Sequence, residues 1–337
     1  MKTSLKFIGF ILVVILVLLF VSLFLISPVS STDTAKKDFV ISDGETAGRI
    51  AQNLLDEGLI RSVTAFKVSA KILRLDHNFK SGTYSVTKSW NTPEIVFRLT
   101  LGGLARIQLL EGWNIKEMSD LWQLKGFGKA ETFKQATQSD EWDNQYNFLK
   151  DKPKNVDLEG YLFPDTYEIN PASGENGLIK KMLDNFDQKF TSEMRAELKK
   201  RGMTIFEAVT LASIVEKEAG SDCLQGGTNT AMIADIFLRR LEIGLALQSD
   251  ATVNYITGKG RLQPSINDTK INSPYNTYQN RGLTPGPISN PGLCALKAVV
   301  YPKANNYLYF LTSLDGKNFH YATDYAGHLA NKRKYLD

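Results

Sequence analysis

An apolar segment near the N-terminus constrains this chain of 337 residues more than any other feature. Phe7 to Ile26 is a run of 20 residues without a charged side chain. At about 1.5 Å per residue, a helix of this length crosses a hydrocarbon layer of roughly 30 Å. A cleaved signal peptide is the alternative, but its apolar region usually has only about 7–15 residues, and no A-x-A motif precedes Pro28 or Ser31. The segment therefore predicts a single transmembrane helix over residues 7–26.

The charges on either side of this segment predict its orientation. Lys2 and Lys6 precede it, whereas acidic residues offset the lysines that follow it. Because the more positive flank stays in the cytoplasm, residues 1–6 are expected to be cytoplasmic and the chain beyond residue 26 to be exported. Residues 27–37 are mostly small or polar and are interpreted as a linker.

Composition and spacing exclude several classes of protein. The net charge is only +4 and the basic residues are scattered, so no concentrated patch favours a nucleic-acid partner. The three histidines lie far apart and the two cysteines are isolated, unlike a zinc or iron–sulfur site, so no metal and no cofactor are expected. In an oxidising compartment Cys223 and Cys294 are able to form a disulfide, but two buried thiols explain them almost as well, and the sequence leaves both open.

Residues 38–103 have the pattern of a small α+β subdomain. Their apolar periodicity predicts a strand, two helices and a second strand, over residues 39–41, 47–57, 63–73 and 82–86. Gly58 is interpreted as the C-terminal cap of the first helix. The order β-α-α-β is common and does not by itself indicate a function. Gly44-Glu45-Thr46, at the start of the first helix, resembles a LysM-type glycan-binding module.

Residues 104–337 are expected to form a larger mixed α+β domain. The predicted elements include a strand at 106–110, helical segments within 116–149, and a C-terminal hairpin of 307–311 with 318–321 around a turn at Asp315-Gly316. The polar stretch 151–157 contains a proline and is interpreted as a connector. The predicted fold class is therefore α+β, with one membrane helix, one small subdomain and one larger domain.

The most informative part of the larger domain is a helix that ends in two glutamates. Thr204 and Glu207 have the spacing of a capping box, which predicts a helix that begins near Ile205. Apolar residues occur all around this helix, so it is expected to be buried. Glu216 and Glu218 lie at its C-terminal end, where the helix dipole disfavours an acid and burial of a carboxylate is costly. Acids in such positions indicate either a functional site or a structural ion pair.

Helix geometry separates the two glutamates. Residues two apart are rotated by about 200° around the axis, so Glu216 and Glu218 cannot form a catalytic pair. One is expected to face a cleft, and the other to pair with a base such as Lys217, Arg239 or Arg240. Burial and the helix C-terminus would raise the pKa of the cleft-facing carboxyl and keep it protonated near neutral pH. From these residues alone, catalysis and a structural salt bridge are equally good interpretations.

Three downstream segments have the composition of a carbohydrate site. Residues 247–255 and 273–278 are rich in hydrogen-bonding side chains and tyrosines. Residues 282–292 contain too much proline and glycine for a helix or strand interior and predict a rigid, shaped loop. An ordinary surface connector is the alternative, but loops of this length in a compact domain are often binding loops.

These motifs occur in an order that resembles the YceG-like family. The resemblance rests on Leu158 to Tyr167, Ala212 to Glu218, Leu247 to Asp250, Tyr275 to Tyr278 and the loop from Gly282 to Gly292. It implies Glu218 as the catalytic residue, because the family's catalytic glutamate matches the second acid of the Glu-Lys-Glu segment. The other matching positions are expected to bind substrate (Gln248, Asp250, Tyr275, Asn276, Thr277, Ser289 and Asn290) or to support the site (Glu159 and Glu216).

The resemblance implies an endolytic lytic transglycosylase of peptidoglycan, a lyase that needs no cofactor. Glu218 would protonate the oxygen between N-acetylmuramic acid and N-acetylglucosamine. As a carboxylate it would then take the proton of the muramic acid 6-hydroxyl, which attacks C1 and leaves a 1,6-anhydro end. The family also implies an inner-membrane anchor, a periplasmic catalytic domain, and action on nascent glycan strands beside penicillin-binding synthases as partners.

Two other functions fit the same residues. A lysozyme-like muramidase would use Glu218 as the acid and Asp250 or Glu159 as a second carboxylate. A peptidoglycan-binding scaffold would recruit synthases through the LysM-like module and the membrane helix without cutting glycan. The end groups of the products separate the two enzymes, and a Glu218→Gln variant separates a catalyst from a scaffold.

Overall fold

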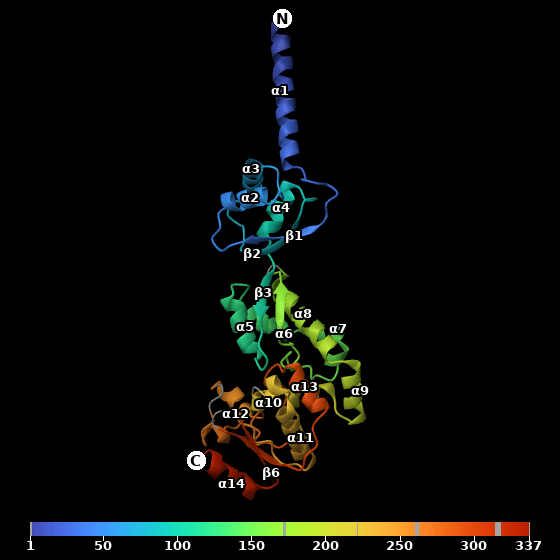
Figure 1. The fold of residues 1–337 in the computed structure, drawn as a ribbon, viewed down its shortest axis with the longest axis vertical. Coiled ribbons are helices and arrows are strands. Elements are labelled where there is room, and N and C mark those ends of the chain that lie inside the picture. Colours follow the sequence, from blue (N-terminus) through green and yellow to red (C-terminus); the bar gives the residue numbers. More distant parts are fainter. Residues whose placement is uncertain (1, 171–172, 221, 260–262, 314–317, 337) are drawn as a thin grey trace. The chain divides into compact units, whose positions relative to one another are not determined.

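The computed structural model describes residues 2–170, 173–220, 222–259, 263–313 and 318–336 (Figure 1). Within these residues, helices are combined with three two-stranded sheets, which confirms the predicted α+β class. The chain divides into two compact units, which we call the N-terminal unit (Met1–Ile107 with Glu168–Gly174) and the C-terminal unit (Gln108–Tyr167 with Glu175–Asp337).

The apolar N-terminal segment forms helix α1, Lys2–Ile26 (Figure 1). Its side chains from Val13 to Phe20 are 39–72% exposed. Judged on the described residues alone, none of the helices combines the length and the low polarity that a membrane span requires.

The N-terminal unit is built on the antiparallel strands β1 (Lys36–Ile41) and β2 (Gly82–Thr87), in which Phe39 lies opposite Tyr84. Three helices complete it, namely α2 (Ala47–Asp56), α3 (Val63–Ile72) and α4 (Thr92–Thr100). Each begins after a polar side chain that accepts a hydrogen bond from the first turn, namely Thr46, Ser62 and Asn91. Apolar residues of both strands and all three helices share one buried core. The predicted β-α-α-β order is therefore observed.

The remaining helices of the described residues lie in the C-terminal unit, apart from Gly174 at the start of α8. They are α5 (Ile115–Leu124), α6 (Ala130–Thr137), α7 (Glu141–Gln145), α8 (Gly174–Lys189), α9 (Ser192–Lys200), α10 (Ile205–Ala219), α11 (Thr228–Glu242), α12 (Asp250–Thr257), α13 (Leu293–Val300) and α14 (Tyr325–Tyr335). Short 3₁₀ turns are η1 (Asn147–Leu149), η3 (Asp222–Gln225) and η4 (Asp268–Lys270).

Two further sheets complete the topology. Strand β3 (Ala105–Gln108) pairs with β4 (Thr166–Ile169). Strand β5 (Tyr309–Thr312) pairs antiparallel with β6 (Phe319–Ala322), with Leu311 opposite His320, so the predicted C-terminal hairpin is observed. The predicted turn at residues 315–316 lies outside the described residues.

Helix α10 lies at the centre of the C-terminal unit. Thr204 Oγ1 accepts a hydrogen bond from Glu207 N (3.1 Å), and the Glu207 carboxylate accepts one from Thr204 N (2.9 Å). The predicted capping box is therefore confirmed. The side chains from Ala208 to Val215 are buried on every side, with α9, α11, α12 and α13 as neighbours. The last turn of α10 carries both glutamates, which are only partly buried.

Cys223 and Cys294 form a disulfide, which decides between the two alternatives that the sequence left open. The bond joins η3, just after α10, to the first turn of α13. The segment that follows the Glu218 helix is thus tied to the end of the loop 282–292.

Candidate active site around Glu218

Glu216 and Glu218 leave α10 toward different surroundings, as helix geometry predicts. Glu218 lines a cavity of about 580 Å³, and Glu216 does not. Glu216 accepts a hydrogen bond from the backbone N–H of Gly292 (3.0 Å) at the start of α13. The predicted ion pair of this second glutamate with a lysine or arginine is wrong. Among the described residues no lysine or arginine forms an ion pair with Glu216, and Lys217 instead donates to the carbonyl of Gly112 (3.1 Å). The N-terminus of α13 supplies the donor instead.

The start of α12 holds Glu218 by one of its two carboxyl oxygens. Ser249 Oγ donates to Glu218 Oε1 at 2.5 Å, and Ala251 N approaches the same atom at 3.5 Å. Neither donor occupies Oε2. A carboxyl that is oriented through one oxygen presents the other to a ligand in the cavity.

Burial raises the pKa of Glu218 above its usual range, and the negative charge of Asp250 raises it further. The Ser249 hydrogen bond and the charge of Arg240 act in the opposite direction without cancelling the rise. Because a raised pKa means that the carboxyl keeps its proton to higher pH, a larger fraction of Glu218 is able to donate a proton near neutral pH. Burial, the cause expected from the sequence, is confirmed as the main one.

Asp250 lines the same cavity, but one of its oxygens is already engaged. Its Oδ1 accepts a hydrogen bond from Tyr278 Oη at 2.6 Å. It is also the first residue of α12, where the helix dipole favours a negative charge. Burial raises the pKa of Asp250, and the Tyr278 bond counteracts that rise. Asp250 is therefore an anchored acid beside Glu218.

Thr277 fixes the turn that precedes α12. Its Oγ1 accepts a hydrogen bond from Ser249 N (3.0 Å) and lies 2.8 Å from Thr252 Oγ1, and its carbonyl accepts one from Gln248 N (3.1 Å). Gln248 has a φ of +52°, a left-handed conformation that costs a non-glycine residue on the order of 1–2 kcal/mol. These bonds stabilise the strained turn, which places the exposed Gln248 side chain on the cavity wall.

Arg240 is the buried cation of the cavity. Its guanidinium donates to the carbonyl oxygens of Ala246 (3.1 Å), Leu247 (2.7 Å) and Leu308 (2.7 Å). Its Cζ lies 4.8 Å from the ring centre of Tyr309. Arg240 thereby connects α11, the turn before α12 and the hairpin, which together surround the cavity.

The rest of the cavity wall comes from elements that the sequence did not indicate. The hairpin side contributes Tyr309, Phe310, Leu311, Thr312 and Ser313, and the C-terminal side contributes Tyr325, His328, Lys332 and Leu336. Neither the hairpin nor α14 was predicted to contribute to the site. The spacing of Tyr325, His328 and Lys332 places them on one helix face, which is the signal that the sequence offered.

Five of the seven residues predicted to bind substrate do not line this cavity, namely Tyr275, Asn276, Thr277, Ser289 and Asn290. Asn276 is buried, and its Nδ2 donates to the carbonyl oxygens of Thr269 (3.1 Å) and Ile271 (2.8 Å). The ring of Tyr275 lies 5.2 Å from that of Tyr255. Asn276 thus fixes the loop that carries Thr277, while substrate contacts of Tyr275 and Asn276 stay a prediction.

Glu159, Ser289 and Asn290 belong to a separate buried network. Asn290 Nδ2 donates to Glu159 Oε1 (2.7 Å), and Glu159 also accepts from Ile115 N (3.0 Å) at the start of α5. Ser289 Oγ donates to the carbonyl of Ser213 (3.1 Å) on α10. Burial raises the pKa of Glu159 well above its ordinary value. The network holds the loop 282–292 against α10 and α5, and it lies outside the lining of the Glu218 cavity.

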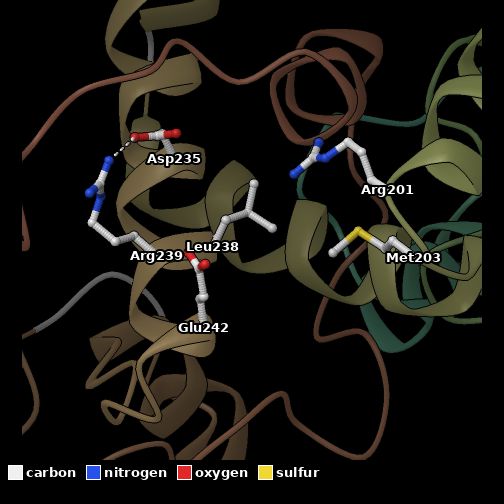
Figure 2. Close-up of a pocket in the computed structure, with 6 residues that line it drawn as sticks. All are labelled: Arg201, Met203, Asp235, Leu238, Arg239 and Glu242. Atoms are coloured by element: carbon white, nitrogen blue, oxygen red, sulfur yellow. Dashed lines mark ion pairs between the residues drawn. The ribbon is translucent and has the colours of Figure 1, made fainter.

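A second hollow, of about 510 Å³, is lined by α11 and by residues just before α10 (Figure 2). Figure 2 shows Arg239 directed toward Asp235 on the same helix, 3.7 Å away, with Arg201 and Met203 across the hollow. Arg201 donates to the carbonyl oxygens of Val299 (2.8 Å) and Val300 (3.2 Å), and Arg239 forms an ion pair with Asp235. The chemistry therefore favours the Glu218 cavity. Among the described residues, no group of three or more His, Cys, Asp or Glu side chains is arranged to hold a metal.

Known proteins are similar to this chain over most of its length. A protein of Bacillus subtilis (strain 168) named endolytic murein transglycosylase is 30% identical over 306 residues, covering 87% of this chain and 83% of that protein. A protein of the same name from Streptococcus pneumoniae (strain D39) is 30% identical over 336 residues, covering 90% of this chain. This chain spans only 60% of the length of that pneumococcal relative.

A solved structure and a family model agree with the match to these relatives. A 2.6 Å crystal structure of a YceG-like protein from Listeria monocytogenes is similar to this chain with a TM-score of 0.62 and 29% identity, covering 88% of this chain and 98% of that one. The model of the YceG-like family matches residues 39–334, a range that begins within β1 and ends within α14. The chain therefore belongs to the YceG-like family.

Proposed function

We propose that this chain is an endolytic lytic transglycosylase of peptidoglycan. It cleaves the bond between N-acetylmuramic acid and N-acetylglucosamine and leaves a 1,6-anhydro end. The observation that carries the proposal is Glu218, a partly buried carboxyl with a raised pKa on the wall of a cavity of about 580 Å³. The relatives named endolytic murein transglycosylase support the same substrate and reaction.

A single carboxyl is enough for this reaction because the substrate supplies its own nucleophile. Protonated Glu218 donates its proton to the glycosidic oxygen, and the bond from that oxygen to C1 of the muramic residue breaks. The Glu218 carboxylate then accepts the proton of the muramic 6-hydroxyl, whose oxygen bonds to C1. Attack within one sugar has a high effective molarity, and the step restores protonated Glu218.

The contacts of Asp250 favour this reaction over hydrolysis by a muramidase. A muramidase needs a second carboxylate that attacks C1 or activates water. Asp250 is the candidate in this cavity, but its Oδ1 is engaged by Tyr278, and its charge raises the pKa of Glu218. We therefore assign Asp250 a supporting electrostatic role that helps Glu218 to keep its proton.

Mass spectrometry of digested glycan strands tests the proposal. The wild type is expected to release fragments with 1,6-anhydro ends, and Glu218→Gln is expected to lose about 10²–10⁴-fold in rate while it still binds glycan. Glu242→Gln is the matched control, because this exposed glutamate on α11 lies outside the Glu218 cavity. Ordinary reducing ends would support the muramidase instead, and full cellular function of Glu218→Gln would support a scaffold.

We also propose that residues 7–26 anchor the protein in the inner membrane by a single span. Residues 1–6 would be cytoplasmic, and the chain beyond the linker 27–37 would be periplasmic. The exposed apolar side chains of α1, together with Lys2 and Lys6 before them, support this arrangement. Removal of residues 1–26 is expected to release the protein from membranes and to leave cleavage of soluble glycan unchanged. Co-sedimentation of the shortened protein with membranes would contradict the anchor.

Residues 38–103 are further proposed as a LysM-like glycan-binding subdomain, with residues 104–337 as the catalytic domain. A hollow of about 600 Å³ beside Gly44-Glu45-Thr46 supports this assignment. Gly48→Trp places a large side chain where a Cβ meets no neighbour within 4 Å, so it is expected to fill the hollow. Weaker binding to insoluble peptidoglycan would support the assignment, and unchanged binding would contradict it. We propose penicillin-binding synthases as partners of this protein. Cross-linking in cells tests this proposal.

A further inference from the structure

Helix α14 brings one lysine to the wall of the Glu218 cavity. Lys332 is exposed and lines this cavity together with Asp250 and His328. Its charge opposes the rise that burial causes in the pKa of Asp250 and contributes to the lowered pKa of His328, so it acts across the cavity. Among the described residues, no acidic side chain lies within ion-pair distance of its Nζ and none accepts a hydrogen bond from it.

The other charged groups of the cavity already have protein partners. Arg240 donates to three backbone carbonyls. Asp250 accepts from Tyr278, and Glu218 accepts from the start of α12. Lys332 is therefore the one charged group of the described cavity wall whose donors all remain free for a ligand. An ammonium group in this position binds anions, and a carboxylate is the anion that a peptidoglycan strand carries.

We propose that Lys332 binds a carboxylate of the muramic residue whose bond is cut. This inference rests on the proposed function and adds a substrate-recognition residue to it. Muramic acid differs from glucosamine only by its 3-O-lactyl group, whose carboxyl is either free or linked to a peptide that has carboxylates of its own. A cation in the same cavity as the acid that cleaves the bond places the muramic residue, and not the glucosamine, at Glu218. A compact ammonium group on a flexible stem accommodates either source of the carboxylate.

The neighbours of Lys332 suit the sugar that carries this carboxylate. Tyr325 and His328 lie on the same face of α14. The ring centre of Tyr309 is 5.9 Å from that of Tyr325 and 5.4 Å from that of His328. These rings form an aromatic wall against which the apolar face of a pyranose packs. Burial lowers the pKa of His328, with smaller effects from the charges of Arg240 and Lys332, so its imidazole stays neutral and does not compete for the carboxylate.

Kinetics on two chemically matched glycans test the proposal. One glycan has free lactyl carboxylates, and the other has the same carboxylates converted to neutral methylamides. Lys332→Met is expected to raise KM about five- to tenfold on the first glycan, with little change in kcat, and to leave KM on the second unchanged. Lys332→Arg should keep the preference of the wild type. Added salt should raise KM of the wild type on the charged glycan and affect Lys332→Met much less.

Two further measurements identify the source of the carboxylate and test whether the effect is specific to Lys332. Peptide-bearing strands with free or amidated stem carboxylates show whether the lactyl group or the peptide is recognised. Lys334→Met is the matched control, because its Nζ lies 5.0 Å from the ring of Tyr335 and the residue is outside the cavity lining. Equal effects of Lys332→Met on charged and neutral glycans, or no effect on either, would overturn the proposal.

Binding measured in a Glu218→Gln background separates this proposal from the reaction itself. A preference for charged glycan that depends on Lys332, without anhydro products from the wild type, would contradict the proposed reaction alone. Anhydro products without that preference would contradict the role of Lys332 alone. Fluorescence anisotropy of labelled glycan strands provides the binding measurement.

Discussion

Glu216 shows how one carboxyl at the end of a buried helix links stability to pH. Burial raises its pKa from the ordinary value of 4.5 to about 7; the charge of Glu111 adds to the rise, while the Gly292 N–H and Lys217 oppose it. Between these two values the folded protein holds a proton that the unfolded chain has lost. The carboxyl therefore stabilises the fold fully below pH 4.5, and this contribution, on the order of 3 kcal/mol, is lost as the pH rises through about 7.

Glu216→Gln is expected to remove this part of the pH dependence. Glutamine keeps an oxygen that accepts from Gly292 N, but it does not ionise. The variant should match the wild type below pH 4.5 and exceed its free energy of unfolding by up to about 3 kcal/mol above pH 7. Urea unfolding at several pH values between 4 and 8 measures the difference, with Glu242→Gln as a control on the exposed surface. A difference that stays constant with pH would refute this account of Glu216.

At the scale of elements, the capping box of α10 is the local interaction with the clearest expected effect. Thr204→Ala removes the side-chain acceptor for Glu207 N and is expected to lower stability by about 1 kcal/mol. The cap lies at the opposite end of α10 from Glu218, so the rate of glycan cleavage by folded protein should stay within about twofold. Thermal unfolding and a cleavage assay check the two expectations, with Thr323→Ala, an exposed threonine outside any helix, as the control. A large loss of rate at temperatures where the variant is folded would show that the cap positions the active site.

The elements also show where sequence reasoning succeeds and where it stops. The start and the burial of α10 follow from neighbouring residues, so the spacing of Thr204 and Glu207 and the apolar periodicity predict them. The partners of the two glutamates are distant in sequence: Ser249 is 31 residues from Glu218, and Gly292 is 76 residues from Glu216. Periodicity has no information about which distant donor reaches a carboxylate. Helix α14 was missed for a related reason, since its polar face resembles an ordinary solvated surface until the hairpin lies beside it.

At the scale of the whole molecule, the Cys223–Cys294 disulfide acts by restricting the unfolded chain. The two cysteines are 71 residues apart, a separation for which loop-closure entropy gives about 4 kcal/mol, and measured effects are typically about 2–4 kcal/mol. Replacing both cysteines by serine should lower the free energy of unfolding by this amount under oxidising conditions. A reductant should cause the same loss in the wild type and no further loss in the double variant.

Urea unfolding with and without dithiothreitol measures these effects, and equal stability of the oxidised and reduced wild type would contradict them. The bridge joins the segment after the Glu218 helix to the end of the loop 282–292, but Glu218 itself is oriented by Ser249 and not by either cysteine. Glycan cleavage by the reduced protein should therefore continue at the rate of the oxidised protein up to the denaturant concentration at which the fold is lost. A fall in rate before unfolding would instead show that the disulfide shapes the cavity.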